Sequence, residues 1–213
     1  MTSLLAIFIK GGWVMYLILL CSLVGMAVVV ERFIVLRKAR INATHFILRL
    51  KSLILKENME EAIELCSRTE GSLPKVLERG IAKHDRDKKE VQETIETAGR
   101  EEVYNLEKNL SIVATVAGVA PLLGFLGTVT GMIRAFMQIE KLSGNVNATV
   151  LAGGIWEALL TTAYGLIVGI PAYLFYNYLL SKVQRIVFEM EVGSNEIIEL
   201  LYTEKENELK SRK

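Results

Sequence analysis

Three stretches of the sequence are almost continuously apolar, and charged residues lie between and beyond them. Residues 12–30, 110–133 and 158–181 contain no Asp, Glu, Lys or Arg. Each meets the length of about 20 residues that a helix needs to span about 30 Å of hydrocarbon. The pattern therefore predicts an all-α integral membrane protein with three transmembrane helices.

The first apolar stretch lies close to the N-terminus, so a cleaved signal peptide is the alternative interpretation. Its length, the lack of an Ala-x-Ala-like exit and the charges that follow it favour a retained anchor. Those charges are Glu31, Arg32, Arg37, Lys38 and Arg40. Because basic residues beside a span favour the cytoplasmic side, the N-terminus is expected outside.

The same rule predicts the organisation of the whole chain. Its parts are the N-terminal periplasmic end with the first span (1–36), a cytoplasmic helical loop (37–109), the second span (110–136), a short periplasmic loop (137–149), the third span (150–181) and a cytoplasmic C-terminal helix (182–213). Only Lys10, Arg134 and Lys141 among the basic residues fall outside or at the outer boundary.

The cytoplasmic part carries helix start and stop signals. Asn58 followed by Glu61 resembles a capping box that opens a helix. Gly71 is suited to closing that helix, and Ser72 to capping the next one.

Two of the spans are predicted to extend beyond the bilayer. Residues 87–118 contain no Pro and predict one long helix that enters the second span. The third span continues as an apolar stripe at helical spacing, formed by Val183, Ile186, Val187 and Met190. These extensions predict a cytoplasmic helical bundle.

Composition narrows the function classes. The net charge of +1 gives no large basic surface for nucleic acid. No span combines Ser with His, and no pair of Asp residues or His/Glu metal-ligand cluster occurs in the membrane, so neither an enzyme nor a metal or cofactor is expected. Cys21 and Cys66 fall on different sides of the predicted boundary, so a disulfide between them is implausible.

Small residues recur in the second and third spans. Gly127-x-x-x-Gly131 and Gly165-x-x-x-Gly169 are patterns that allow helix backbones to approach closely in lipid. Packing within one chain and packing between subunits both explain them. The predicted packing residues are Gly124, Gly127, Gly131, Gly165, Gly169, Pro121 and Pro171.

Glu157 is the one acid inside an apolar segment of the third span, where a carboxylate costs on the order of 2.5 kcal/mol or more. It is either functional or snorkels to the outer interface. No basic residue within the three spans is an obvious partner for it. The nearby hydroxyls of Thr115, Thr128, Thr130, Thr161 and Thr162 are each most simply explained by a hydrogen bond to their own helix.

Three segments carry a resemblance to a known family. "GVAPLLGFLGTVTGMIRAF" and "GGIWEALLTTAYGLIVGIPAYLFYN" are similar to the second and third spans of the ExbB/TolQ proton-channel family, which is distantly related to the flagellar stator protein MotA. "MYLILLCSLVGMAVVVERFIVLRKAR" resembles its first span and the basic stretch that follows. The resemblance covers nearly the whole chain, whereas MotA-like chains would have a fourth span.

The resemblance implies roles for four residues. The family's acid in G-I-x-E-A-L falls on Glu157, its threonine in G-T-V-x-G on Thr128, and its threonine before the G-L of the third span on Thr162. Thr161 lies where relatives often have Ala. These residues line or border the family's route for protons or, in some stators, sodium ions. Glu157 and Thr162 lie about 140° apart around an ideal helix, so they need not share a face. A pore formed between subunits relaxes that difficulty.

Family members form a pentamer around the single-span helices of an ExbD or TolR dimer, whose membrane aspartate carries the proton. The resemblance implies a ring-forming subunit of a bacterial inner-membrane motor that uses the proton motive force to energise a TonB- or TolA-like protein. The apolar stripe of the third helix is expected to add to contacts between subunits.

Two other functions stay open. A passive anchor would recruit a soluble partner through its cytoplasmic helices. The second alternative is a secondary transporter. The sequence favours it less, because it has no internal repeats and too few spans unless the chain oligomerises. The sequence also leaves open whether the ion is H⁺ or Na⁺ and whether the system is Ton-like, Tol-like or another motor.

Overall fold

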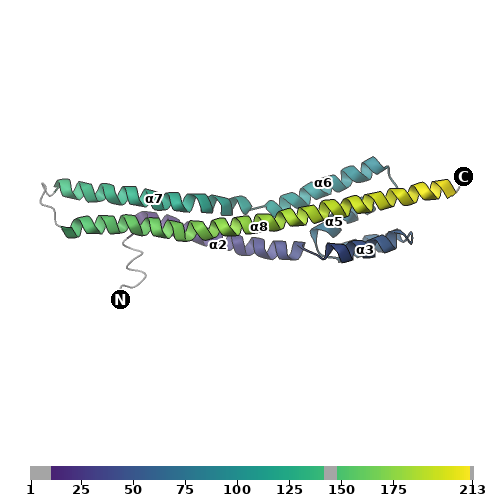
Figure 1. The fold of residues 1–213 in the computed structure, drawn as a ribbon, viewed down its shortest axis with the longest axis horizontal. Coiled ribbons are helices and arrows are strands. Elements are labelled where there is room, and N and C mark those ends of the chain that lie inside the picture. Colours follow the sequence, from purple (N-terminus) through teal and green to yellow (C-terminus); the bar gives the residue numbers. More distant parts are fainter. Residues whose placement is uncertain (1–10, 142–147, 212–213) are drawn as a thin grey trace. The chain divides into compact units, whose positions relative to one another are not determined.

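The computed structural model describes residues 11–141 and 148–211, and every regular element in them is an α-helix (Figure 1). The helices are α2 (Gly12–Ala39), α3 (Ala43–Ile54), α4 (Met59–Arg68), α5 (Ser72–Ile81), α6 (Lys88–Glu107), α7 (Leu110–Lys141) and α8 (Ala148–Ser211). Three helical stretches, which contain α2, α7 and α8, are long and apolar enough to cross a membrane. The predicted fold class is confirmed.

The helices divide into two compact units. The first, here called the membrane unit, takes in α2 up to Arg32 and residues Asn109–Tyr178. Large apolar side chains cover its exterior, among them Leu122, Phe125, Leu159, Ile167 and Leu174, each more than 60% exposed. So much exposed apolar surface is the composition that contact with lipid requires, whereas in water it would drive aggregation.

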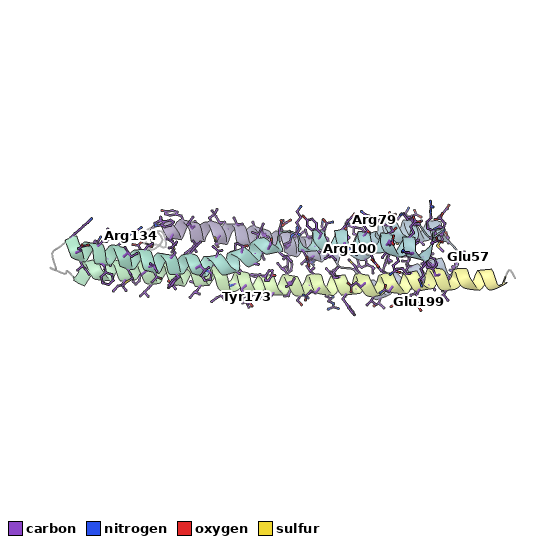
Figure 2. The ribbon with its side chains drawn as sticks, turned by 90° about the horizontal axis from the view of Figure 1, so that it is seen from above. Glu57, Arg79, Arg100, Arg134, Tyr173 and Glu199 are labelled. Carbon is purple, nitrogen blue, oxygen red and sulfur yellow. The ribbon has the colours of Figure 1, made fainter. Side chains whose placement is uncertain are left out.

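The second unit consists of residues 33–108 and 179–213. Helices α3, α4, α5 and α6 pack against one another in chain order. Its core is apolar and closed to solvent, with Leu50, Leu77, Ile81 and Ile197 at 2% exposure or less. Ion pairs lie around this core: Lys51 of α3 contacts Glu196 of α8 at 2.7 Å, and Arg79 of α5 (Figure 2) contacts Glu101 of α6 at 2.5 Å.

The start of α4 agrees with the sequence signals, whereas the start of α5 differs from them. Asn58 caps α4 as predicted: its Oδ1 accepts the Glu61 N–H at 3.3 Å, and its Nδ2 donates to Glu61 Oε2 at 2.6 Å. The predicted role of Gly71 is wrong, because α4 already ends at Arg68 and Gly71 is the N-cap of α5. Its φ of 148° favours glycine, and Ser72 is the first helical residue rather than the cap.

The long helix predicted over residues 87–118 is interrupted. Helix α6 ends at Glu107 and α7 begins at Leu110, with Asn109 at a φ of 64° between them. Asn tolerates this left-handed conformation better than most residues. Its side-chain amide also donates to Glu31 Oε2 at 3.1 Å. The other predicted extension is confirmed, since α8 runs from Ala148 to Ser211 as one helix.

The apolar stripe of α8 is covered within the chain itself. Val183, Ile186 and Met190 are at most 5% exposed, and Val187 is half-buried. Most of this stripe therefore packs inside the second unit. A charged residue at position 186 would disturb the fold of the chain before it reported on contacts between subunits.

Cys66 is a free thiol in the core of the second unit, at 1% exposure. Burial, and secondarily the Glu78 carboxylate, raise the pKa of this thiol to about 12. Only the thiolate reacts as a nucleophile, so a raised pKa makes the cysteine inert. The stabilising contribution of the neutral thiol is present below its unfolded pKa and is lost as the pH rises toward the folded value.

We expect Cys66 to resist alkylation. In a Cys21→Ala background at pH 8.5, iodoacetamide should modify the folded protein at least about a hundredfold more slowly than the SDS-unfolded chain, because the thiolate fraction and access both fall. The measurement is the rate of mass increase by mass spectrometry. Equal rates in the two states would contradict the buried position of Cys66.

Candidate functional site

Helices α7 and α8 of the membrane unit lie side by side (Figure 1), and glycines allow their backbones to approach closely. A Cβ atom on Gly124 would lie 2.8 Å from the Thr161 carbonyl oxygen, and one on Gly165 would lie 2.6 Å from the Ala120 carbonyl oxygen. A Cβ on Gly131 would lie 3.2 Å from the Gly154 carbonyl oxygen. Packing within one chain therefore accounts for these glycines, without any contact between subunits.

The remaining predicted packing residues differ from one another. A Cβ on Gly127 would overlap Thr161, and one on Gly169 would lie 2.5 Å from Cγ of Pro121. Pro121 thus sits at the α7–α8 contact. Pro171 is exposed on α8, so the contact between these two helices leaves it free for the lipid or another chain.

The threonines fall into two groups. Thr115, Thr130 and Thr161 donate only to carbonyl oxygens of their own helices, as the simplest interpretation of each predicts. Thr161 is fully buried against Gly127.

Thr128 and Thr162 instead link the two helices. Their hydroxyls share a hydrogen bond. Thr128 Oγ1 also lies 3.1 Å from the carbonyl oxygen of Ala158 on α8, and Thr162 Oγ1 lies 3.2 Å from that of Gly124 on α7. The structure thus brings together two residues 34 positions apart that the sequence had singled out.

Glu157 has a basic partner in the structure, and the prediction that it lacks one is wrong. Arg134 of α7 (Figure 2) donates from Nη1 to Glu157 Oε1 at 2.7 Å. The Glu157 side chain is 21% exposed and that of Arg134 47%. In the sequence, Arg134 directly follows the uncharged stretch of the second span. In the structure, α7 continues to Lys141, so Arg134 is still helical and its guanidinium lies beside α8. This ion pair offsets the cost of placing the carboxylate in an apolar helix.

The first residue of α2 lies against the same ion pair. A Cβ on Gly12 would lie 2.5 Å from Glu157 Oε1 and 3.3 Å from Arg134 Nη1, and the φ of Gly12 is 69°. The positive φ favours glycine here, and a Cβ would oblige the ends of the Glu157 and Arg134 side chains to move. Sequence reasoning missed Gly12 and Arg134. The sequence signal that could have identified Arg134 was a basic residue six positions after Thr128 in a largely apolar segment.

The two polar clusters follow one another along the α7–α8 contact. Glu157 and Thr162 are separated by five residues, a rise of about 7.5 Å along α8, and both have partners on α7. Both residues thus meet α7 although an ideal helix places them about 140° apart, and the partner of Glu157 is the end of a long side chain. The arrangement provides hydroxyls, carbonyl oxygens and one acid–base pair in sequence inside the membrane unit.

These features define an all-helical, multi-pass membrane protein with polar groups placed along the contact between two spans. The model of the MotA/TolQ/ExbB proton channel family matches residues 51–192, and the chain belongs to this family. The matched region includes the threonine pair and the ion pair but not Gly12.

Several curated relatives are similar to this chain. The biopolymer transport protein ExbB-like 1 of Synechocystis is 30% identical over 201 residues, which cover 92% of this chain and 78% of that protein. An ExbB homolog of Methanothermobacter thermautotrophicus is 27% identical over 191 residues, which cover 89% and 67% of the two chains. The Tol-Pal system protein TolQ of Haemophilus influenzae is 44% identical over 95 residues, which cover 44% and 40%.

The close approach of α7 and α8 generates a stability prediction. Gly165→Ala should destabilise the purified protein by about 1–3 kcal/mol, because the added methyl meets backbone atoms that cannot rotate away. The midpoint of thermal unfolding in detergent measures the effect. Gly118→Ala is the matched control, since a Cβ there meets nothing within 4 Å and helix propensity favours Ala by about 1 kcal/mol. Equal effects of the two substitutions would contradict the helix contact.

Proposed function

We propose that this chain is the ring-forming subunit of an inner-membrane proton channel that uses the proton motive force to energise a periplasm-spanning partner. Membership of the MotA/TolQ/ExbB proton channel family supports the ion-conducting role. The names of its relatives, which include biopolymer transport proteins and a Tol-Pal system protein, support a TonB- or TolA-like partner. The ring itself is proposed as a pentamer.

The observation that carries the proposal is the pair of polar clusters along the α7–α8 contact. Thr128 and Thr162 present two hydroxyls to one another, and Glu157 lies about 7.5 Å further along α8. Hydroxyls both donate and accept hydrogen bonds, so they can take part in a chain of proton transfers. We assign Glu157, Thr128 and Thr162 to the wall of the ion path, with Thr161 behind them as a packing residue.

The proton acceptor itself is proposed to belong to a second chain with one span and a membrane carboxyl group, of the ExbD or TolR type. One elementary charge that crosses 100 mV releases about 2.3 kcal/mol. Repeated transfers supply enough free energy for mechanical work on a periplasmic partner. The chain's own contribution is a rigid wall of paired polar groups.

The proposed topology places the N-terminus in the periplasm and the C-terminus in the cytoplasm of the bacterial inner membrane. The basic residues in the last turn of α2, Arg37 and Lys38, then lie on the cytoplasmic side, as the positive-inside rule requires. The ends of α7 and α8 that carry Arg134 and Glu157 lie toward the periplasm. The ion pair is then the outer of the two polar clusters.

We expect Glu157→Gln to lower partner-dependent proton flux in proteoliposomes by about tenfold or more, because it removes the titratable carboxylate. Gln has nearly the same shape as Glu, so the substitution changes little else. Gln still accepts a hydrogen bond from Arg134, so assembly should persist. Glu140→Gln, at the exposed end of α7, is the matched control and should conduct normally. Flux equal to that of the unaltered protein would contradict the role of Glu157 in the ion path and leave the acid with a packing role alone, whereas a complex that conducts no protons at all would favour a passive anchor.

The hydroxyl pair should matter in the same assay. Thr128→Val and Thr162→Val each remove one hydroxyl at nearly constant volume and should lower flux several-fold. Thr130→Val is the matched control, because the Thr130 hydroxyl donates only to its own helix. If Thr130→Val reduces flux as strongly as Thr128→Val, the assignment of the cross-helix pair to the ion path is wrong.

The ring is tested by native mass spectrometry in mild detergent. We expect a homo-oligomer, most simply a pentamer, because the exterior of the membrane unit offers extensive apolar surface and the proposed path needs walls from more than one chain. A monomer that persists across several lipid and detergent conditions would contradict the ring.

A further inference from the structure

The Arg134–Glu157 pair lies where three helices of the membrane unit meet. Arg134 comes from α7, Glu157 from α8, and Gly12 begins α2 directly beside both. The pair is held at a donor–acceptor distance of 2.7 Å, with the carboxylate about four-fifths covered. A guanidinium in this position has two consequences: it occupies an oxygen of the carboxylate, and it makes the cluster electrically neutral.

We propose that Arg134 excludes sodium ions from the Glu157 carboxylate and thereby makes the ion path selective for protons. This inference rests on the proposed function, since it concerns selectivity at the same path. It assigns a role to a residue that the sequence comparison with ExbB/TolQ segments did not single out.

The reason lies in what each ion needs. A hard cation such as Na⁺ binds through several oxygen ligands, of which a carboxylate is the strongest attractor. At Glu157 it would have to displace the guanidinium or stay within a few ångströms of its positive charge. In a partly covered site of low effective dielectric constant, repulsion at that distance is strong.

A proton does not need such a coordination shell. It moves between oxygen atoms as one O–H bond forms and another breaks, so hydroxyls such as those of Thr128 and Thr162 suffice to relay it. Because the path can carry protons without a cation resting on Glu157, the ion pair penalises Na⁺ more than H⁺. Removing the Arg134 guanidinium leaves the Glu157 carboxylate uncompensated beside α2, α7 and α8. That carboxylate then becomes available as an oxygen ligand for a cation.

The test measures sodium binding by thermal unfolding of the purified full chain at pH 8, with NaCl compared against choline chloride at equal ionic strength. The unaltered protein should unfold at the same midpoint in both salts. Arg134→Gln should be selectively stabilised by NaCl, with an affinity for Na⁺ raised by about tenfold or more, because a ligand that binds only the folded state raises its stability. If Arg134→Gln does not purify, Arg134→Met removes the same charge and retains an unbranched side chain.

Three further variants locate the effect. Arg134→Lys keeps the charge and should show no sodium response. Arg134→Gln combined with Glu157→Gln should lose the response, because the carboxylate is gone. Arg185→Gln is the matched control elsewhere: it removes the Arg185–Glu189 pair of α8, whose donor–acceptor distance is 3.0 Å and whose acid is 25% exposed, and should show no response.

The inference is overturned if Arg134→Gln unfolds identically in NaCl and choline chloride, if the double variant still responds to sodium, or if the unaltered protein responds. A second measurement follows flux in proteoliposomes with the partner chain at a fixed pH gradient. Added Na⁺ should inhibit Arg134→Gln and leave the unaltered complex unchanged. An unaltered complex that conducts no protons would refute the proposed function, whereas the binding experiment would still decide the role of Arg134.

Discussion

The requirement that polar groups inside a bilayer find their partners within the protein governs the membrane unit. Lipid supplies no hydrogen bonds, so a hydroxyl or carboxylate on a spanning helix must be satisfied by its own helix or by a neighbour. The glycines of α7 and α8 bring the two backbones close enough for short side chains to reach across. The threonine pair and the ion pair both depend on that proximity. Bulkier residues in place of the glycines would separate the helices and leave these groups unpaired.

The second unit follows the ordinary rules of soluble helical proteins. Its core is closed and apolar, its ion pairs are peripheral, and the side chain of Asn58 caps α4. Peripheral ion pairs of this kind contribute little to stability, so burial of residues such as Leu77 and Ile81 carries most of it. Helix α8 contributes residues to both units as one uninterrupted element, whereas α6 and α7 are separated at Asn109. One part of the chain is thus suited to contact with lipid and another part to contact with water.

Much of the fold was predictable because its signals are local. The three spans follow from apolar stretches of sufficient length, and the Asn58 cap follows from two residues three positions apart. The interruption at Asn109 was missed because helix propensity is continuous on either side and tolerance of a positive φ is a weak signal. Gly71 was assigned to the wrong helix for a similar reason: a glycine between two helices serves either the end of one or the start of the next.

The candidate site separates what sequence determines from what tertiary structure decides. Glu157, Thr128 and Thr162 were recognisable from residue type, apolar surroundings and resemblance to the ExbB/TolQ segments. Which groups they contact was not, because the axial register of α7 against α8 sets whether Arg134 meets Glu157 and whether the two threonines face each other. That register results from many small contacts between residues distant in sequence. The amino-acid pattern alone therefore determined that polar side chains lie within the spanning helices. Only the packing of those helices decided how the side chains are paired.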